Sequence, residues 1–161
     1  MSEKVNPIPD GYHSVTPYLT VSSAREALTF YEEALGAETV TVMAMPEGER
    51  VMHAEMRIGD SLVGVGDEWP EMEGSPVAPT TAETVTSSLL IYCEDVDAAF
   101  QHAVEAGCTP MMPPETMFWG DRFAKVEDPY GHQWHLATHV EDLAPEEVEQ
   151  RAAAAFAKDG K

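Results

Sequence analysis

The sequence predicts an α+β fold made of two βαβββ modules and a C-terminal helix. The order strand, helix and three strands occurs twice along the 161 residues, and the predicted helices of the two halves close on Gly36 and Gly107. A further helical segment follows the repeat and has no counterpart in the first half. A chain of this length buries roughly 70% of its unfolded surface, so it can fold without disulfide or metal staples.

The first half begins with an N-terminal arm at residues 1–13, and residues 14–66 form the first module. Apolar side chains recur at helical spacing over residues 24–35, after two serines that can cap the helix and before Gly36, which can end it. Strands of this module are predicted at 15–21, 38–45, 50–58 and 61–66. The segments PEGE and GD between the last three strands are typical of hairpin turns.

The second half begins after a linker loop at residues 67–84, which is rich in proline, glycine and acidic residues. Residues 85–140 form the second module, with a helix over EDVDAAFQHAVEAGC. Its strands are predicted at 86–93, 109–114, 116–126 and 132–139, the last two separated by the turn DPYG. Residues 141–161 form a C-terminal helix and tail, with Pro145 and acidic side chains in the first helical turn.

The charge of the chain limits its partners. Nine Lys and Arg residues stand against 29 Asp and Glu residues, which gives a formal net charge of −20. A surface of this sign repels nucleic-acid phosphates and anionic lipids, so we expect neither nucleic acid nor a membrane as partner. The simplest interpretation of the charge is solubility.

The remaining composition favours a cytoplasmic protein. No run approaches the roughly 18 apolar residues of a membrane span, and the first residues lack the apolar core of a signal peptide. The two cysteines, Cys93 and Cys108, could form one disulfide, but both follow apolar runs, which favours buried free thiols.

Several segments resemble one known superfamily. FYEEALGA follows the first strand, and DPYGHQWHLATH lies near the end of the repeat. In this order they resemble the vicinal oxygen chelate superfamily, which includes glyoxalase I, extradiol dioxygenases, and fosfomycin- and bleomycin-resistance proteins. VMHAEMRIGDSLVGVGDEWP, FWGDR and GHQWHLATHVEDL are most similar to its PhnB-like bacterial members. The similarity covers about residues 13–150, and function does not follow from the fold alone.

The resemblance implies that the two modules form a curved mixed sheet around a cavity, usually within a homodimer. Metal-using members of the superfamily place one ligand on each of four strands. The matching positions in this sequence are Thr16, Gly64, Ser88 and His135. Three of these four residues offer neither an imidazole nor a carboxylate, which divalent metals require in such sites. No cofactor is therefore predicted at the usual positions.

Strand alternation places other polar residues beside these positions. If His135 faces the cavity, Ala137 does so too, whereas Trp134 and Leu136 face the core. Tyr18 and Ser88 face the cavity by the same rule.

A two-residue turn at Gly59 and Asp60 sets the register of the hairpin RVMHAEMRIGDSLVGVG. It pairs Glu55 with Gly64 and puts His53 on the same face, where the glycine leaves room for a ligand.

Each candidate has a simpler alternative. His53 and Glu55 can lie on a solvated face, can bind a ligand, or can form a relocated divalent-metal site with His135. Arg122 can clamp a carboxylate or phosphate, or form a salt bridge. Trp119 can stack on a ligand or fill the core.

The three histidines of EDPYGHQWHLATH are close in the sequence, but their predicted positions on a strand do not form a metal cluster. The segment predicts a strand, so His132 and His135 point to opposite faces, and His135 and His139 lie about 13 Å apart. Only His135 remains a candidate for the cavity.

We therefore expect a dimeric protein that binds a small organic ligand in a cavity without the family-type metal, as bleomycin-resistance proteins sequester theirs. The ligand-binding candidates are Tyr18, His53, Glu55, Ser88, Trp119, Arg122 and His135. The alternative is a metal-dependent or acid–base lyase, isomerase or dioxygenase. A protein-interaction module without a small ligand is a third hypothesis, suggested by the C-terminal helix.

Overall fold

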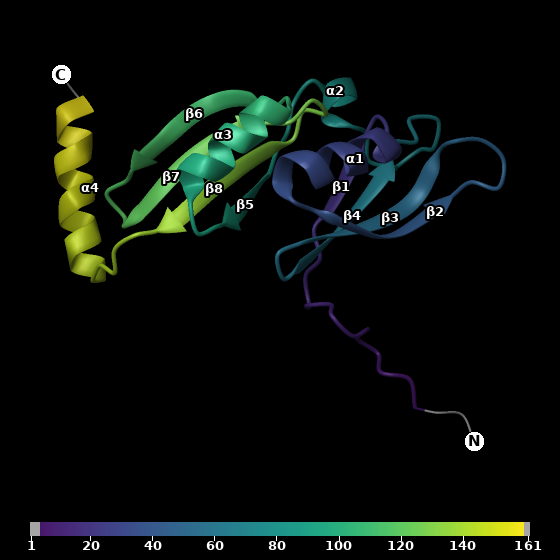
Figure 1. Cartoon of the computed structure of the whole chain (residues 1–161), viewed down its shortest axis with the longest axis horizontal. Coiled ribbons are helices and arrows are strands. Elements are labelled where there is room, and N and C mark those ends of the chain that lie inside the picture. The colour runs from purple at the N-terminus through teal and green to yellow at the C-terminus, as the bar shows by residue number, and fades with distance from the viewer. Residues whose placement is uncertain (1–3, 160–161) are drawn as a thin grey trace. The chain divides into compact units, whose positions relative to one another are not determined.

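The computed structural model describes residues 4–159, which form two compact units that divide between Thr84 and Val85. Each unit is a four-stranded mixed sheet with one helix across one face (Figure 1). The two βαβββ modules and the C-terminal helix predicted from the sequence are confirmed. No described helix has both the length and the apolar character needed to cross a membrane.

The first unit has the strand order β1-β4-β3-β2, with β1 parallel to β4 and the other neighbours antiparallel. Its elements are β1 (Tyr18–Val21), α1 (Ala24–Leu35), β2 (Glu38–Ala44), β3 (Val51–Ile58), β4 (Ser61–Asp67) and the short α2 (Pro79–Ala82). The predicted hairpin register is confirmed, since Ile58 pairs with Ser61 and Glu55 with Gly64.

Helix α1 forms where the sequence predicts it. The Ser23 side chain accepts a hydrogen bond from Glu26 N, and Gly36 ends the helix with a φ of 66°, which favours glycine. Its apolar side packs on the sheet, where one set of alternating strand residues is buried: Leu19, Val21, Ala54, Met56, Val63 and Val65. This burial provides the core of the first unit.

The second unit repeats the topology with the order β5-β8-β7-β6. Its elements are β5 (Ser88–Tyr92), α3 (Val96–Ala106), β6 (Thr109–Thr116), β7 (Asp121–Glu127), β8 (Gln133–His139) and α4 (Pro145–Asp159). Val96 of α3 packs against Ala124 and Leu136, and Trp134 is fully buried, as the alternation predicts. Both cysteines are free.

Helix α4 is attached to the second unit mainly by side chains. Arg151 makes a bidentate salt bridge to Glu141, and the Phe156 ring lies 5.9 Å from that of Phe118. Phe156 is nevertheless 67% exposed. The helix therefore contributes little to the core.

Two boundaries differ from prediction. The first strand begins at Tyr18 instead of residue 15, because its regular pairing with β4 starts with Tyr18 and Gly64. The segment 117–120 is the turn between β6 and β7, with Gly120 at a φ of 101°, so Trp119 lies in a turn. The N-terminal arm contacts the first sheet, since Tyr12 donates a hydrogen bond to Glu55 of β3.

Candidate ligand-binding site

We call the face of each sheet opposite its helix the open face. On the open face of the first sheet, Gly64 pairs with Tyr18 of β1 on one side and with Glu55 of β3 on the other. His53 lies two residues before Glu55 and shares its face. Three of the predicted ligand-binding residues therefore lie together.

These three side chains form a chain of hydrogen bonds with Tyr12. The Tyr18 hydroxyl lies 2.9 Å from His53 Nδ1, and His53 Nε2 lies 3.1 Å from Glu55 Oε1. The Tyr12 hydroxyl donates a hydrogen bond to the same Glu55 oxygen. A carboxylate only accepts, so in the uncharged imidazole Nε2 carries the hydrogen and Nδ1 accepts from Tyr18.

The chain of hydrogen bonds changes the acidity of its members. The bonds from Tyr12 and His53 hold the pKa of Glu55 below its ordinary value, although burial acts the other way. Burial, followed by the charge of Glu55, raises the pKa of Tyr18. Glu55 is therefore a carboxylate and Tyr18 a phenol at neutral pH.

The space that Gly64 was expected to leave for a ligand is filled by Tyr18. A Cβ built on Gly64 would overlap the Tyr18 ring, and one on Gly66 would lie 3.0 Å from the Tyr18 hydroxyl oxygen. The two glycines accommodate this aromatic ring, which is itself 51% exposed. A ligand on this face would meet the exposed side of Tyr18.

On the open face of the second sheet, Ser88 pairs with Gln133, and His135 pairs with Leu90 of β5 and Lys125 of β7. Burial, followed by the charge of Lys125, lowers the pKa of His135. The imidazole is therefore uncharged at neutral pH.

Ala137 also belongs to the open face of the second sheet, but it is fully buried. It pairs with Tyr92 and Phe123, whose larger side chains flank it on the two neighbouring strands.

A row of aromatic rings continues from His135 along the open face of the second sheet. Phe123 meets His135 edge to face at 5.2 Å between centroids, Trp119 meets Phe123 at 5.6 Å, and Phe118 meets Trp119 at 5.0 Å. We call His135, Phe123, Trp119 and Phe118 the aromatic row. Trp119 therefore lies with Phe123 on the open face, although it is part of a turn.

One end of the aromatic row is fixed by Asp121, which is only 5% exposed. Its carboxylate accepts hydrogen bonds from Tyr92, Trp119 and His139 at 2.9, 3.2 and 2.8 Å. Burial would raise the pKa of Asp121, but these hydrogen bonds outweigh it and lower the pKa. Asp142 contacts the other nitrogen of His139 at 2.7 Å.

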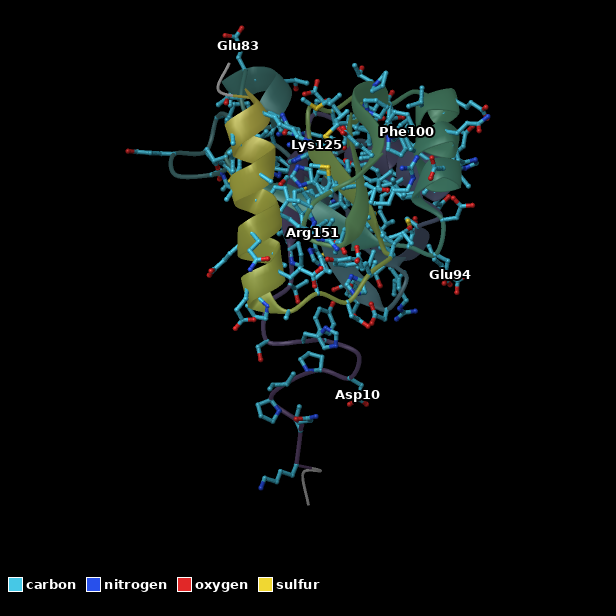
Figure 2. The ribbon with its side chains drawn as sticks, turned by 90° about the vertical axis from the view of Figure 1, so that its left-hand side faces the viewer. Asp10, Glu83, Glu94, Phe100, Lys125 and Arg151 are labelled. Atoms are coloured by element: carbon cyan, nitrogen blue, oxygen red, sulfur yellow. The ribbon has the colours of Figure 1, made fainter. Side chains whose placement is uncertain are left out.

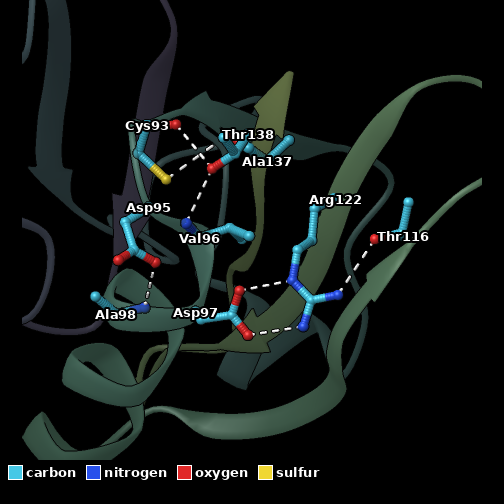
Figure 3. A network of polar contacts seen from close by, with 9 residues as sticks. All are labelled: Cys93, Asp95, Val96, Asp97, Ala98, Thr116, Arg122, Ala137 and Thr138. Carbon is cyan, nitrogen blue, oxygen red and sulfur yellow. Dashed lines mark hydrogen bonds and ion pairs between the residues drawn. The ribbon is translucent and has the colours of Figure 1, made fainter. Parts of the chain in front are cut away.

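Arg122 lies on the helix-covered face, not on the open face. Its guanidinium makes a bidentate pair with Asp97 of α3 at 2.6 and 2.8 Å and donates to Thr116 at 3.3 Å (Figure 3). This is the salt-bridge alternative, and the prediction that Arg122 clamps a ligand in the cavity is not supported. The turn at 117–120 ends before Asp121 and sets the strand register, which points Arg122 toward α3.

The residues at the family-type metal positions do not fit a divalent ion. His135 pairs with Leu90 of β5 and lies diagonally across from Ser88 on the same strand, and the Tyr18 ring covers Gly64. One imidazole in the four positions supplies too few donors.

The relocated metal set divides between the units, with His53 and Glu55 in one and His135 in the other. Within either unit, residues 4–159 gather no three His, Cys, Asp or Glu side chains suited to a metal ion. The set from both units stays a prediction.

Two surface hollows of about 440 and 270 Å³ lie along α1, and both include Arg25 and Thr29 in their lining. No predicted site residue lines either hollow. The open faces of the two sheets are therefore better candidates for the ligand-binding site than these hollows.

Sequence reasoning missed Tyr12, Asp121, Phe123 and Lys125. The last two could have been found, because registering β7 against β8 across the DPYG turn places Lys125 opposite His135. Tyr12 gave no such signal, since its contact with Glu55 spans 43 positions in the sequence.

The chain contains two βαβββ units, and each leaves one face of its sheet open. In proteins of this class, strand residues on the open faces form the binding site. Residues 11–136 match the family model of the Glyoxalase/Bleomycin resistance protein/Dioxygenase superfamily, and the chain belongs to this superfamily.

The chain has similar proteins in several organisms. It is 34% identical to Mb0911c of Mycobacterium bovis over 137 residues, which cover 84% of this chain and 90% of that protein. The crystal structure of the Arabidopsis thaliana At5g48480 product is 25% identical, with a TM-score of 0.60, over 78% of this chain and 98% of that one. A PhnB protein from Bacillus cereus has the same fold at 19% identity, with a TM-score of 0.60, over 78% and 99% of the two chains.

Proposed function

We propose that the chain binds a small organic molecule on the open faces of its sheets, as a homodimer and without the metal ion of the metal-using members of its superfamily. The aromatic row is the observation that carries this proposal. It offers rings whose edges and faces suit apolar and aromatic ligands. Its neighbours Leu90 and Tyr92 are 47% and 59% exposed, so apolar surface remains to be covered.

Sequestration is the favoured form of this function. The positions Thr16, Gly64, Ser88 and His135 provide one metal-binding side chain, so the chemistry that a metal would supply has no fitting site there. A bound molecule would be held by ring contacts and a few polar groups, which is how preformed small-molecule sites work.

The homodimer is part of the proposal because of the apolar side chains on the open faces. Tyr18 and Met43 on the first sheet are 51% and 53% exposed, in addition to Leu90 and Tyr92 on the second. A second copy that faces these sheets would cover them and create an enclosed site. Light scattering after size-exclusion chromatography should give twice the mass of 17.6 kDa.

An NMR titration tests ligand binding directly. The purified protein is titrated with a panel of small aromatic and aliphatic molecules, and we expect aromatic members to shift amide signals of β5, β7 and β8. Phe123→Ala should weaken these ligands, whereas Phe30→Ala on α1 serves as control. A panel without any binder, or shifts confined to α1, would contradict the proposal. Stoichiometric metal in protein purified without chelator would contradict its metal-free part.

An acid–base lyase or isomerase is the second candidate, favoured by the hydrogen-bond chain of Tyr18, His53 and Glu55. Glu55 orients the imidazole, His53 can take a proton, and Tyr18 can give one. A dioxygenase or other metal enzyme would instead use His53, Glu55 and His135 as ligands.

The enzyme hypothesis is tested by a substrate screen of the wild type. If the variant with alanine in place of Tyr18, His53 and Glu55 keeps the turnover of the wild type, the acid–base hypothesis is wrong. Loss of turnover at His135→Ala, together with a metal requirement, would favour the metal-dependent form.

A further inference from the structure

Lys125 stands apart from the other cations of this acidic chain. Among the described residues, Arg50, Arg122 and Arg151 pair with carboxylates, and Arg25 donates to the carbonyl of Glu49. Lys125 has no ion pair with any described carboxylate, although acidic residues outnumber basic ones by about three to one. The other unpaired cations, such as Arg57 and Lys158, are exposed, whereas Lys125 is half-buried.

The position of Lys125 is central on the open face of the second sheet (Figure 2 labels the residue). It pairs with His135 on β8 and with Met112 on β6, and its Nζ lies 5.8 Å from the centroid of the Phe123 ring. The Lys125 residue is half-buried and its ammonium charge has no counter-ion among the described residues, so an anionic ligand would give it a partner.

His135 adds a polar group beside the ammonium. Its ring nitrogens have no hydrogen-bond partner among residues 4–159, and Lys125 helps to keep the ring uncharged. A neutral imidazole offers one N–H donor and one acceptor. An anion placed against Lys125 would therefore find a second donor at His135, with the aromatic row alongside.

We propose that the open face of the second sheet binds a planar aromatic monoanion, such as an aromatic carboxylate, with its charged group at Lys125 and His135 and its ring against Phe123. This inference rests on the proposed ligand-binding function and names the ligand class. The aromatic row and the exposed Leu90 recognise the ring. The single cation can pair with one negative charge, and the net charge of −20 of the chain repels polyanions.

The test compares three probes of similar shape that differ in charge: 2-naphthoate, 2-naphthamide and 2-naphthylmethylamine. Dissociation constants are measured by NMR titration of the full chain at low ionic strength. We expect 2-naphthoate to bind most tightly. Lys125→Met keeps the apolar stem and should weaken 2-naphthoate about ten- to a hundredfold, with little change for 2-naphthamide. Lys158→Met removes the same charge from α4 and should change neither probe.

The outcomes separate this inference from the proposed function. If 2-naphthoate and 2-naphthamide bind equally and Lys125→Met leaves both unchanged, anion recognition is overturned while ligand binding stands. If no probe binds the open face, both are overturned. The urea midpoint of Lys125→Met checks the fold, and His135→Gln gives a second variant that should weaken 2-naphthoate selectively.

Discussion

The ring of Tyr18 lies against the backbone of Gly64, in the space that a side chain at position 64 would occupy. Gly64→Ala should therefore destabilise the protein by about 1–3 kcal/mol, because the ring must move from its place on the strand. Urea unfolding measures the change. In a Tyr18→Ala background the same Gly64→Ala change should cost much less, since the obstructing ring is gone. An equal cost in both backgrounds would contradict this account.

The tautomer of His53 follows from its two partners. Glu55 accepts from Nε2, so the uncharged ring should carry its hydrogen there, which ¹⁵N chemical shifts report directly. Glu55→Ala should reduce the Nε2–H population, because the acceptor is lost. Tyr18→Phe is the matched control and should keep it. Predominance of the Nδ1–H form in the wild type would contradict the arrangement.

The sequence was informative where a local rule decides the structure. Strand alternation predicted that Trp134 and Leu136 are buried, and the short Gly59–Asp60 turn fixed the partner of Glu55. The charge of Arg122 suggests an anion clamp but does not decide on which face of β7 the side chain lies, and it lies on the face covered by α3. The turn at 117–120 resets the register, and a shift of one residue reverses the face of every side chain that follows.

Contacts between distant segments leave no signal in the local sequence. Asp121 receives hydrogen bonds from Tyr92 and His139, which lie 29 and 18 positions away, and nothing in their local sequence marks them as partners. The relation of His135 to His53 and Glu55 was a hypothesis about two modules, and it stays one.

The pairing of Arg122 with Asp97 predicts a small effect on stability and none on ligand binding. Both side chains are at least one-third exposed, so Arg122→Met should lower the urea midpoint only slightly. Binding of 2-naphthoate to this variant should equal that of the wild type. A large loss of affinity would restore Arg122 as a ligand clamp.

The buried carboxylate of Asp121 organises one end of the aromatic row. Asp121→Ala leaves the Tyr92 hydroxyl and the Trp119 indole N–H without their acceptor, so the free energy of unfolding should fall by about 1–3 kcal/mol. Tryptophan fluorescence should shift to the red as Trp119 loosens. Asp142→Ala, at a fully exposed position, should change the stability much less than Asp121→Ala does. Equal effects of the two variants would contradict the role assigned to Asp121.

His139 predicts a pH dependence whose sign follows from its two carboxylate partners. The hydrogen bond to Asp142, and then that to Asp121, raise the pKa of His139 above its ordinary value of 6.5. The folded state therefore binds this proton more tightly than the unfolded chain does. The stability that results is fully present below the unfolded pKa and is lost as pH rises through the folded pKa.

The excess melting temperature of the wild type over His139→Gln should therefore be largest near about pH 5.5, where the carboxylates remain ionised, and should shrink as pH rises through the folded pKa. His135 has the opposite dependence, because burial and Lys125 lower its pKa and its stability term falls as pH drops below 6.5. The contribution of His135 is present in both the wild type and His139→Gln, so it cancels in the difference between their melting temperatures. Repeating the comparison in a His135→Gln background should give the same curve. A difference that grows with pH would contradict the assigned ion pairs.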